Sequence, residues 1–170
     1  MLLPAFQGPE VAPMSRAFVS EAAAEANAAI LPERPISTAP NLVTPRGLQR
    51  IEAEVARLQA RLAEVPPDDP ERPGLARDLR YWRTRAGSAQ PVPPVTGTPD
   101  EVGFGTRVTI HRGASTTAYR IVGEDEADPA QGLLSWTSPV AEALAGARVG
   151  EVVDVGPGRP AVTVLAIEAG

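Results

Sequence analysis

The sequence contains no cysteine, no lysine and a single histidine among its 170 residues. Without cysteine there is no disulfide framework and no thiolate nucleophile, and one histidine is too few for a zinc site, so only carboxylates remain as metal ligands. His111 has no serine in a nucleophile-elbow context, which leaves a catalytic triad without support. No glycine-rich segment has the lysine and spacing of a phosphate-binding loop. We therefore expect a protein with no enzymatic activity and no intrinsic cofactor.

Long apolar runs are also missing. No stretch approaches the roughly 18 apolar residues of a membrane-spanning helix, and residues 1–13 lack both the basic start and the continuous apolar stretch of a signal peptide. The content of 43% hydrophobic and 22% charged residues is ordinary for a globular protein of one or two small domains. The composition favours a cytoplasmic protein with no membrane partner.

Positive charge is scarce and unevenly placed. The formal net charge is −5, yet residues 44–94 carry nine arginines against seven acids, while the segments on either side are acidic. This small excess is too weak for stand-alone nucleic-acid binding, although it suits an arm that approaches RNA inside a larger assembly. The alternative, an ordinary solvated helix surface, remains open.

Residues 1–40 are rich in alanine and proline and show no sustained hydrophobic period. Such segments cannot bury enough apolar surface to offset the entropy of ordering, so we expect a disordered extension. Residues 20–30 are good helix formers and predict one short helix within it.

Residues 41–90 carry the pattern of a first helix that returns on itself. Thr44 and Pro45 are an N-cap residue followed by proline at the first helical position, where the missing N–H costs nothing. Apolar residues then recur at alternating spacings of three and four, as on a helix that packs along a partner helix. These residues are Leu48, Ile51, Val55, Leu58, Leu62 and Val65. The pattern predicts a helix about 33 Å long at roughly 1.5 Å per residue.

A turn over residues 66–74 must interrupt this helix, because it contains four prolines and a glycine. A return helix is expected from Leu75 to Ala86, where apolar residues recur at spacings of four, three and four, and Gly87 should end it. We predict an antiparallel hairpin, a short coiled coil. Two ordinary helices packed on a globular core are the alternative.

Residues 91–101 are proline-rich and predict an extended linker to a second domain over residues 102–170. Alternating apolar and β-branched residues there predict an antiparallel sheet, with a hairpin turn at residues 112–115 and one short helix that starts after Ser138 and ends at Gly146. The expected strands are residues 102–111, 116–122, 133–137, 152–155 and 161–167. The fold class is therefore α+β, a helical hairpin followed by an antiparallel sheet with one helix.

Acidic residues form the remaining candidate sites. Asp68, Asp69 and Glu71 lie on the proline-stiffened turn, where they could share a hard cation such as Mg²⁺ only if a partner supplied further ligands. The alternative role is to stabilise the following helix N-terminus. A second acidic stretch, residues 123–128, follows the second predicted strand and reads as an exposed loop with or without a partner.

Three stretches in the C-terminal part resemble the Gre family of bacterial transcription elongation factors, GreA and GreB. They are residues 123–128, residues 138–146 and residues 149–155. The opening of the first helix, residues 44–48, and residues 79–82 of the return helix are also similar to the family. Residues 14–19 look like the natural start of proteins in a related bacterial subgroup, which predicts translation from Met14.

The resemblance implies an FKBP-like C-terminal domain that docks on bacterial RNA polymerase and directs a coiled coil into its secondary channel. It assigns polymerase contact to Gly123, Glu124, Asp125, Ser138 and Pro139. In cleavage-active members, an Asp and a Glu at the coil tip help to hold Mg²⁺ in the polymerase active site, and Asp68 and Glu71 keep that Asp-x-x-Glu spacing.

Two departures from the family set the expected mechanism. The family continues from its tip acids into a helix, whereas Arg72, Pro73 and Gly74 follow Glu71 here, and the arm is several turns shorter, as in the Rnk-like branch. We therefore expect occlusion of the channel or competition with longer factors, with only indirect contact to nascent RNA or DNA. Assisted transcript cleavage through Asp68, Asp69 and Glu71 is the alternative, and an adaptor without a polymerase role is a third.

Overall fold

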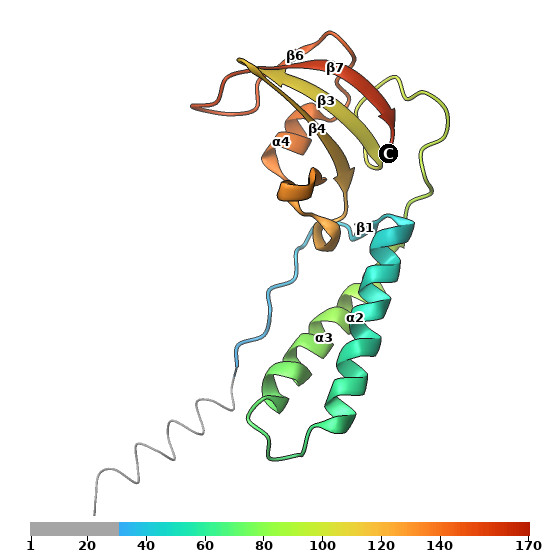
Figure 1. The fold of residues 1–170 in the computed structure, drawn as a ribbon, viewed down its shortest axis with the longest axis vertical. Coiled ribbons are helices and arrows are strands. Elements are labelled where there is room, and N and C mark those ends of the chain that lie inside the picture. Colours follow the sequence, from blue (N-terminus) through green and yellow to red (C-terminus); the bar gives the residue numbers. More distant parts are fainter. Residues whose placement is uncertain (1–30) are drawn as a thin grey trace, which may run out of the picture. The chain divides into compact units, whose positions relative to one another are not determined.

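The computed structural model describes residues 31–170 (Figure 1). The helix expected over residues 20–30 and the start expected at Met14 lie outside the described residues. Residues 33–170 form one compact unit, which contains a pair of helices and a sheet.

Helices α2 (Pro45–Glu64) and α3 (Arg72–Ser88) run side by side as a hairpin (Figure 1). The expected start of α2 is confirmed, since the Thr44 hydroxyl accepts a hydrogen bond from the Gly47 amide at 2.9 Å. The apolar spacing also places its residues as expected, with Ile51 and Leu58 of α2 buried together with Leu79 of α3.

The boundaries of α3 differ from the expected ones. The helix begins at Arg72 because Pro73 falls in the first turn, where proline is tolerated, and it passes through Gly87. The Arg72 guanidinium also closes the turn, because it donates to the carbonyl oxygens of Leu62 at 2.9 Å and Val65 at 2.6 Å. These bonds satisfy carbonyl groups that the end of α2 leaves without intrahelical partners.

A two-residue parallel ladder, absent from the sequence prediction, ties the two ends of the hairpin together. Strand β1 (Leu42–Val43) pairs with β2 (Gln90–Pro91), so the first residue of the expected linker is part of a strand. Buried Asn41 reinforces this ladder, since its side-chain amide donates to the Arg85 carbonyl at 2.8 Å. The chain thus enters and leaves the hairpin at one place.

The second part is a five-stranded sheet in the order β5-β4-β3-β7-β6. Strands β3, β4, β7 and β6 pair antiparallel, but β5 pairs parallel to β4, so the expectation of a purely antiparallel sheet is wrong. Two short 3₁₀ helices, η1 (Glu124–Glu126) and η2 (Pro129–Gln131), form the connection that returns the chain for parallel pairing. The strands are β3 (Thr106–Arg112), β4 (Ser115–Val122), β5 (Leu133–Ser135), β6 (Val152–Val153) and β7 (Val162–Ala169).

One helix, α4 (Pro139–Leu144), covers a face of this sheet, and the result is a mixed α+β fold (Figure 1). It ends two residues before the expected Gly146. The first expected strand is also shorter, because Gly105 takes a positive φ of 82° in the turn that precedes β3. The side chains between α4 and the sheet form the core, chiefly Val108, Val122, Leu144, Val162 and Val164.

Candidate functional site

The acids of the hairpin turn do not converge. Asp68 is exposed, the Asp69 carboxylate accepts from the Glu71 amide at 2.8 Å, and the Glu71 carboxylate pairs with Arg61 at 2.8 Å. The hydrogen bond and charge of Glu71 raise the pKa of the Arg61 guanidinium. In residues 31–170 no three acidic or histidine side chains gather as a metal site. Metal binding at Asp68 and Glu71 stays a prediction, and Glu71 would first have to leave Arg61.

The second acidic stretch is not the exposed loop that the sequence suggested. Gly123 is buried, the Asp125 side chain is 8% exposed, and Glu126 is 3% exposed. The Glu124 side chain keeps a larger exposed fraction, 23%, and Asp128 is also partly exposed. Buried carboxylates require partners, because an unpaired charge inside a protein is costly. Here the partners come from the helical hairpin.

Arg85 of α3 is the main partner of this acidic loop. Its side chain is 2% exposed, its Nε atom donates to Asp125, and its Nη2 atom lies 3.2 Å from Glu124. Tyr81, one turn earlier on α3, donates its hydroxyl to Asp125 at 2.6 Å. Burial lowers the pKa of Arg85, but the hydrogen bond and charge of Asp125 outweigh it and leave the pKa raised. The guanidinium is therefore charged at every pH at which the protein is folded.

Glu126 forms a second, buried contact with the hairpin. The Thr44 hydroxyl donates to its carboxylate at 2.5 Å while it accepts from the Gly47 amide. The carboxylate thus lies at the N-terminus of α2, where the helix dipole favours negative charge. Gly47 leaves room for this approach, since a Cβ atom there would lie 2.7 Å from the carboxylate oxygen. We call the contacts of Thr44, Gly47, Tyr81 and Arg85 with residues 123–126 the junction.

Ser138 and Pro139 lie at the start of α4, away from these contacts. The Ser138 hydroxyl caps the helix by accepting from the Ala141 amide at 3.3 Å, and Pro139 is exposed at the first helical position. Glu124 connects this region to the junction, because its carboxylate also accepts from the Thr137 hydroxyl at 3.3 Å. Of the five residues expected to contact a partner, Pro139 is therefore the one that is fully exposed.

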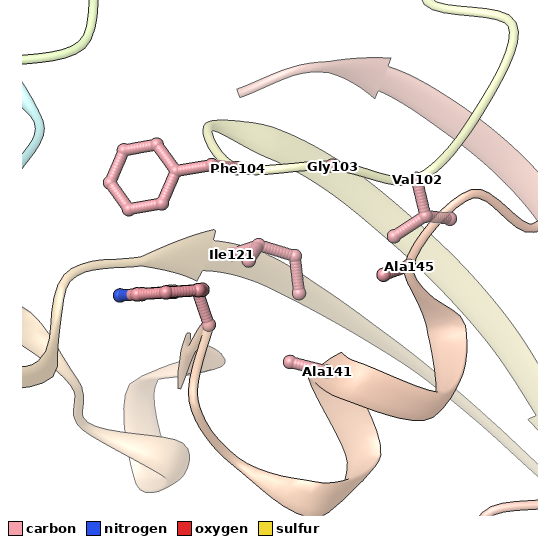
Figure 2. Close-up of a pocket in the computed structure, with 7 residues that line it drawn as sticks. Val102, Gly103, Phe104, Ile121, Ala141 and Ala145 are labelled. Atoms are coloured by element: carbon pink, nitrogen blue, oxygen red, sulfur yellow. The ribbon is translucent and has the colours of Figure 1, made fainter. Parts of the chain in front are cut away.

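An apolar pocket of about 70 Å³ lies beside α4. Figure 2 shows Phe104 on one side of it, with Ile121 of β4 and Ala141 of α4 facing the same space. Trp136 also lines it, and the Trp136 Nε1 atom is buried with no hydrogen-bond partner in the described part of the chain. None of the lining side chains is an acid or a base, so the pocket can bind an apolar group but offers no proton-transfer chemistry.

Sequence reasoning missed the hairpin half of the junction. Tyr81 and Arg85 are four residues apart and share a face of α3, but they lie outside the apolar spacing that identified the helix pair. Many arginines share α3, and nothing local distinguishes the buried one. Thr44 was identified only as a helix cap, since its second hydrogen bond, to Glu126, crosses 82 residues of sequence.

The C-terminal part of the chain matches a known family. Residues 97–169 fit the model of the C-terminal domain of the transcription elongation factors GreA and GreB. This part of the chain is therefore similar to the C-terminal domain of that family. This Gre-type region includes the whole five-stranded sheet, α4 and the acidic half of the junction.

Curated relatives extend the similarity beyond this region. GreB of Neisseria meningitidis serogroup A is 36% identical over 98 residues, 55% of this chain and 60% of the relative. GreA of Desulfovibrio desulfuricans is 38% identical over 96 residues, 55% of this chain and 59% of the relative. Both are named transcription elongation factors. The chain thus spans about 60% of the length of these relatives.

Among solved structures, GreA factor homolog 1 of Thermus thermophilus is 21% identical over 76% of this chain and 99% of its own, with a TM-score of 0.37. A score this low does not establish a common arrangement of the Gre-type region and the hairpin.

Among residues 31–170, no helix combines the length and the apolar character that a membrane crossing requires.

Proposed function

We propose that this chain regulates transcription elongation by binding bacterial RNA polymerase. The match of residues 97–169 to the GreA/GreB C-terminal domain is the observation that carries this proposal. In it, residues 102–170 are an FKBP-like docking domain, and residues 41–90 are a short coiled coil that enters the secondary channel. The protein would act in the cytoplasm, without catalytic activity or a cofactor of its own, and would meet RNA or DNA only indirectly.

Occlusion of the channel, or competition with longer factors, is the mechanism that the contacts support. The 20 residues of α2 span about 30 Å, and the junction fixes the base of this arm to the Gre-type region through two buried carboxylates. At the other end, Asp69 and Glu71 are engaged within the turn. A braced arm with engaged tip acids is suited to block a channel rather than to coordinate a metal.

Transcript cleavage is the alternative, favoured by the exposure of Asp68 and by its spacing to Glu71. In that case the two carboxylates would share Mg²⁺ with the active site of the polymerase. A purified backtracked elongation complex separates the two mechanisms. Occlusion predicts that the wild-type chain slows cleavage stimulated by a full-length Gre factor, and that alanine at Asp68, Asp69 and Glu71 leaves this inhibition unchanged. Stimulated cleavage that disappears in the triple variant would establish the alternative.

Binding to polymerase is tested with the exposed proline of α4. Pro139→Ala in the full chain should weaken binding to purified bacterial RNA polymerase by about fivefold, the loss typical of one moderate interface contact. Pro129→Ala is the matched control, because Pro129 is also exposed at the first position of a short helix. Wild-type protein that fails to bind polymerase in a pull-down would reject the function. Equal affinities of the two variants would reject only the docking surface.

A further inference from the structure

Two residues that precede the hairpin lie against the outer face of α3. The Arg34 guanidinium carbon lies 3.8 Å from the centroid of the Tyr81 ring and 5.7 Å from that of Trp82. The Glu33 carboxylate accepts from Arg80 Nε at 3.0 Å. A longer ion pair joins Arg34 to Asp78 at 3.9 Å. These contacts stretch over more than one turn of α3.

The stacking contact is the strongest of this set. The Glu33 and Arg80 side chains are 63% and 56% exposed, and exposed ion pairs of this kind contribute little. The Arg34 side chain is 37% exposed and covers a tyrosine ring that is itself half-buried. A guanidinium on an aromatic face is attracted by the ring quadrupole and is less hydrated than an ammonium, which favours this site.

Tyr81 connects this contact to the junction. Arg34 lies over the Tyr81 ring, the Tyr81 and Trp82 rings pack at an angle of 84°, and the Tyr81 hydroxyl donates to Asp125 at 2.6 Å. Asp125 in turn receives Arg85. The Tyr81 ring therefore contacts Arg34 on one side, while its hydroxyl is bound to Asp125 on the other.

We propose that Glu33 and Arg34 form a strap that positions Tyr81 and thereby keeps the junction closed. Arg34 is a positioning residue, because within residues 31–170 it has no hydrogen bond or ion pair with residues 123–126 and acts through the Tyr81 ring. The strap couples the chain before the hairpin to the base of the hairpin. Any event that withdraws Arg34 from the ring therefore loosens the arm without touching its tip. The proposal concerns the free protein and does not depend on binding to polymerase.

Hydrogen exchange measured by mass spectrometry on the full chain tests the strap. Within residues 123–127, the amides of Glu126 and Ala127 donate to the carbonyl oxygens of Gly123 and Glu124. We expect these amides to exchange when the junction opens, at a rate that scales with the open population. Removal of an exposed cation–π contact changes such a population by about two- to fivefold, so Arg34→Ala should accelerate exchange in this segment by that factor. The amides of β3, which lies in the middle of the sheet, should keep their wild-type rates.

Three further variants separate positioning from general destabilisation. Arg34→Lys retains a cation for the ring but replaces the guanidinium by a more strongly hydrated ammonium, so it should restore only part of the protection. Arg83→Ala changes an exposed arginine of the same helix, for which no ion pair is recorded within residues 31–170, and should have no effect. Tyr81→Phe keeps the ring but removes the hydroxyl, so Arg34→Ala should add little in that background.

The strap is overturned by any of three results. These are wild-type exchange of residues 123–127 in Arg34→Ala, equal acceleration in β3, or an undiminished effect of Arg34→Ala in the Tyr81→Phe background. The first would show that the stacking contact has no influence on the junction. The second would indicate loss of global stability, and the third would show that Arg34 does not act through the Tyr81 hydroxyl.

Discussion

Gly123 lies where the acidic loop meets the backbone of the hairpin base. A Cβ atom at this position would stand 2.5 Å from the carbonyl oxygen of Leu42, a distance that side chains do not adopt. The obstacle is backbone held in the β1–β2 ladder, so it cannot turn aside as a flexible side chain would. The family resemblance assigned Gly123 to partner contact, but within this chain the residue allows the acidic loop to approach the backbone of Leu42.

We therefore expect Gly123→Ala to destabilise the protein by about 1–3 kcal/mol, the usual cost of forcing extra volume into a packed site. Urea unfolding followed by circular dichroism measures this change. The control is Gly87→Ala in the last turn of α3, where nothing lies within 4 Å of the added methyl group. Alanine there should stabilise by about 0.5–1 kcal/mol through its better helix propensity. Equal effects of the two substitutions would contradict the close contact at Gly123.

At the scale of elements, α3 and η1 meet through a tyrosine whose ionisation depends on that contact. Burial, together with the hydrogen bond to Asp125 and its negative charge, raises the pKa of Tyr81 to about 12, while Arg85 and Arg34 oppose the shift. In the unfolded chain the phenol titrates near pH 10. The unfolded state therefore releases its proton first, and the stabilising contribution is complete below about pH 10 and declines as the pH rises toward 12.

The direction of this pH dependence predicts how the stability of Tyr81→Phe compares with that of the wild type. Below pH 10 the wild type should have the higher urea midpoint, because its hydroxyl satisfies Asp125. The difference should shrink when the measurement is repeated at pH 11, since the ionised phenol is accommodated only in the unfolded chain. Tyr119, the other tyrosine, is present in both proteins and cancels. A difference in midpoint that stays constant from pH 8 to pH 11 would show that Tyr81 and Asp125 are not coupled.

The elements that were predicted correctly are those whose signals are local. Thr44 and Pro45 mark the start of α2 because a cap and a helical first turn involve neighbouring residues. The hairpin of β3 and β4 follows likewise from alternation on both sides of a short turn. The β1–β2 ladder and the parallel pairing of β5 were not predictable, since two or three residues carry no register signal and their partners are remote or parallel.

In the candidate site, too, the local features could be predicted from the sequence and the long-range contacts could not. The acidic stretch was conspicuous in the sequence, but its burial depends on Arg85, which lies about 40 residues earlier. Composition indicates charge and cannot indicate which charges are paired inside the fold. For this reason Asp125 and Glu126, which belong to an acidic loop in the sequence, belong to a buried contact in the structure.

For the whole molecule, the junction makes the hairpin and the sheet part of one unit. Two charged residues, Arg85 and Asp125, are almost completely buried there, at 2% and 8% exposure. A buried ion pair adds little net stability over apolar residues of the same shape, but removal of one partner leaves the other charge buried and uncompensated. We therefore expect the pair to act chiefly by specifying where the hairpin joins the acidic loop.

Arg85→Met tests this role, because it removes the charge but keeps much of the side-chain volume. We expect a loss of about 3–5 kcal/mol, the typical cost of an unpaired buried charge. The double variant Arg85→Met with Asp125→Asn should recover part of this loss, since the neutral amide that replaces the carboxylate can still accept from Tyr81. Calorimetry should show one transition for the wild type and an earlier, separate melting of the hairpin in Arg85→Met. A single transition at the wild-type temperature in Arg85→Met would mean that the remaining contacts of the junction join the sheet and the hairpin without Arg85.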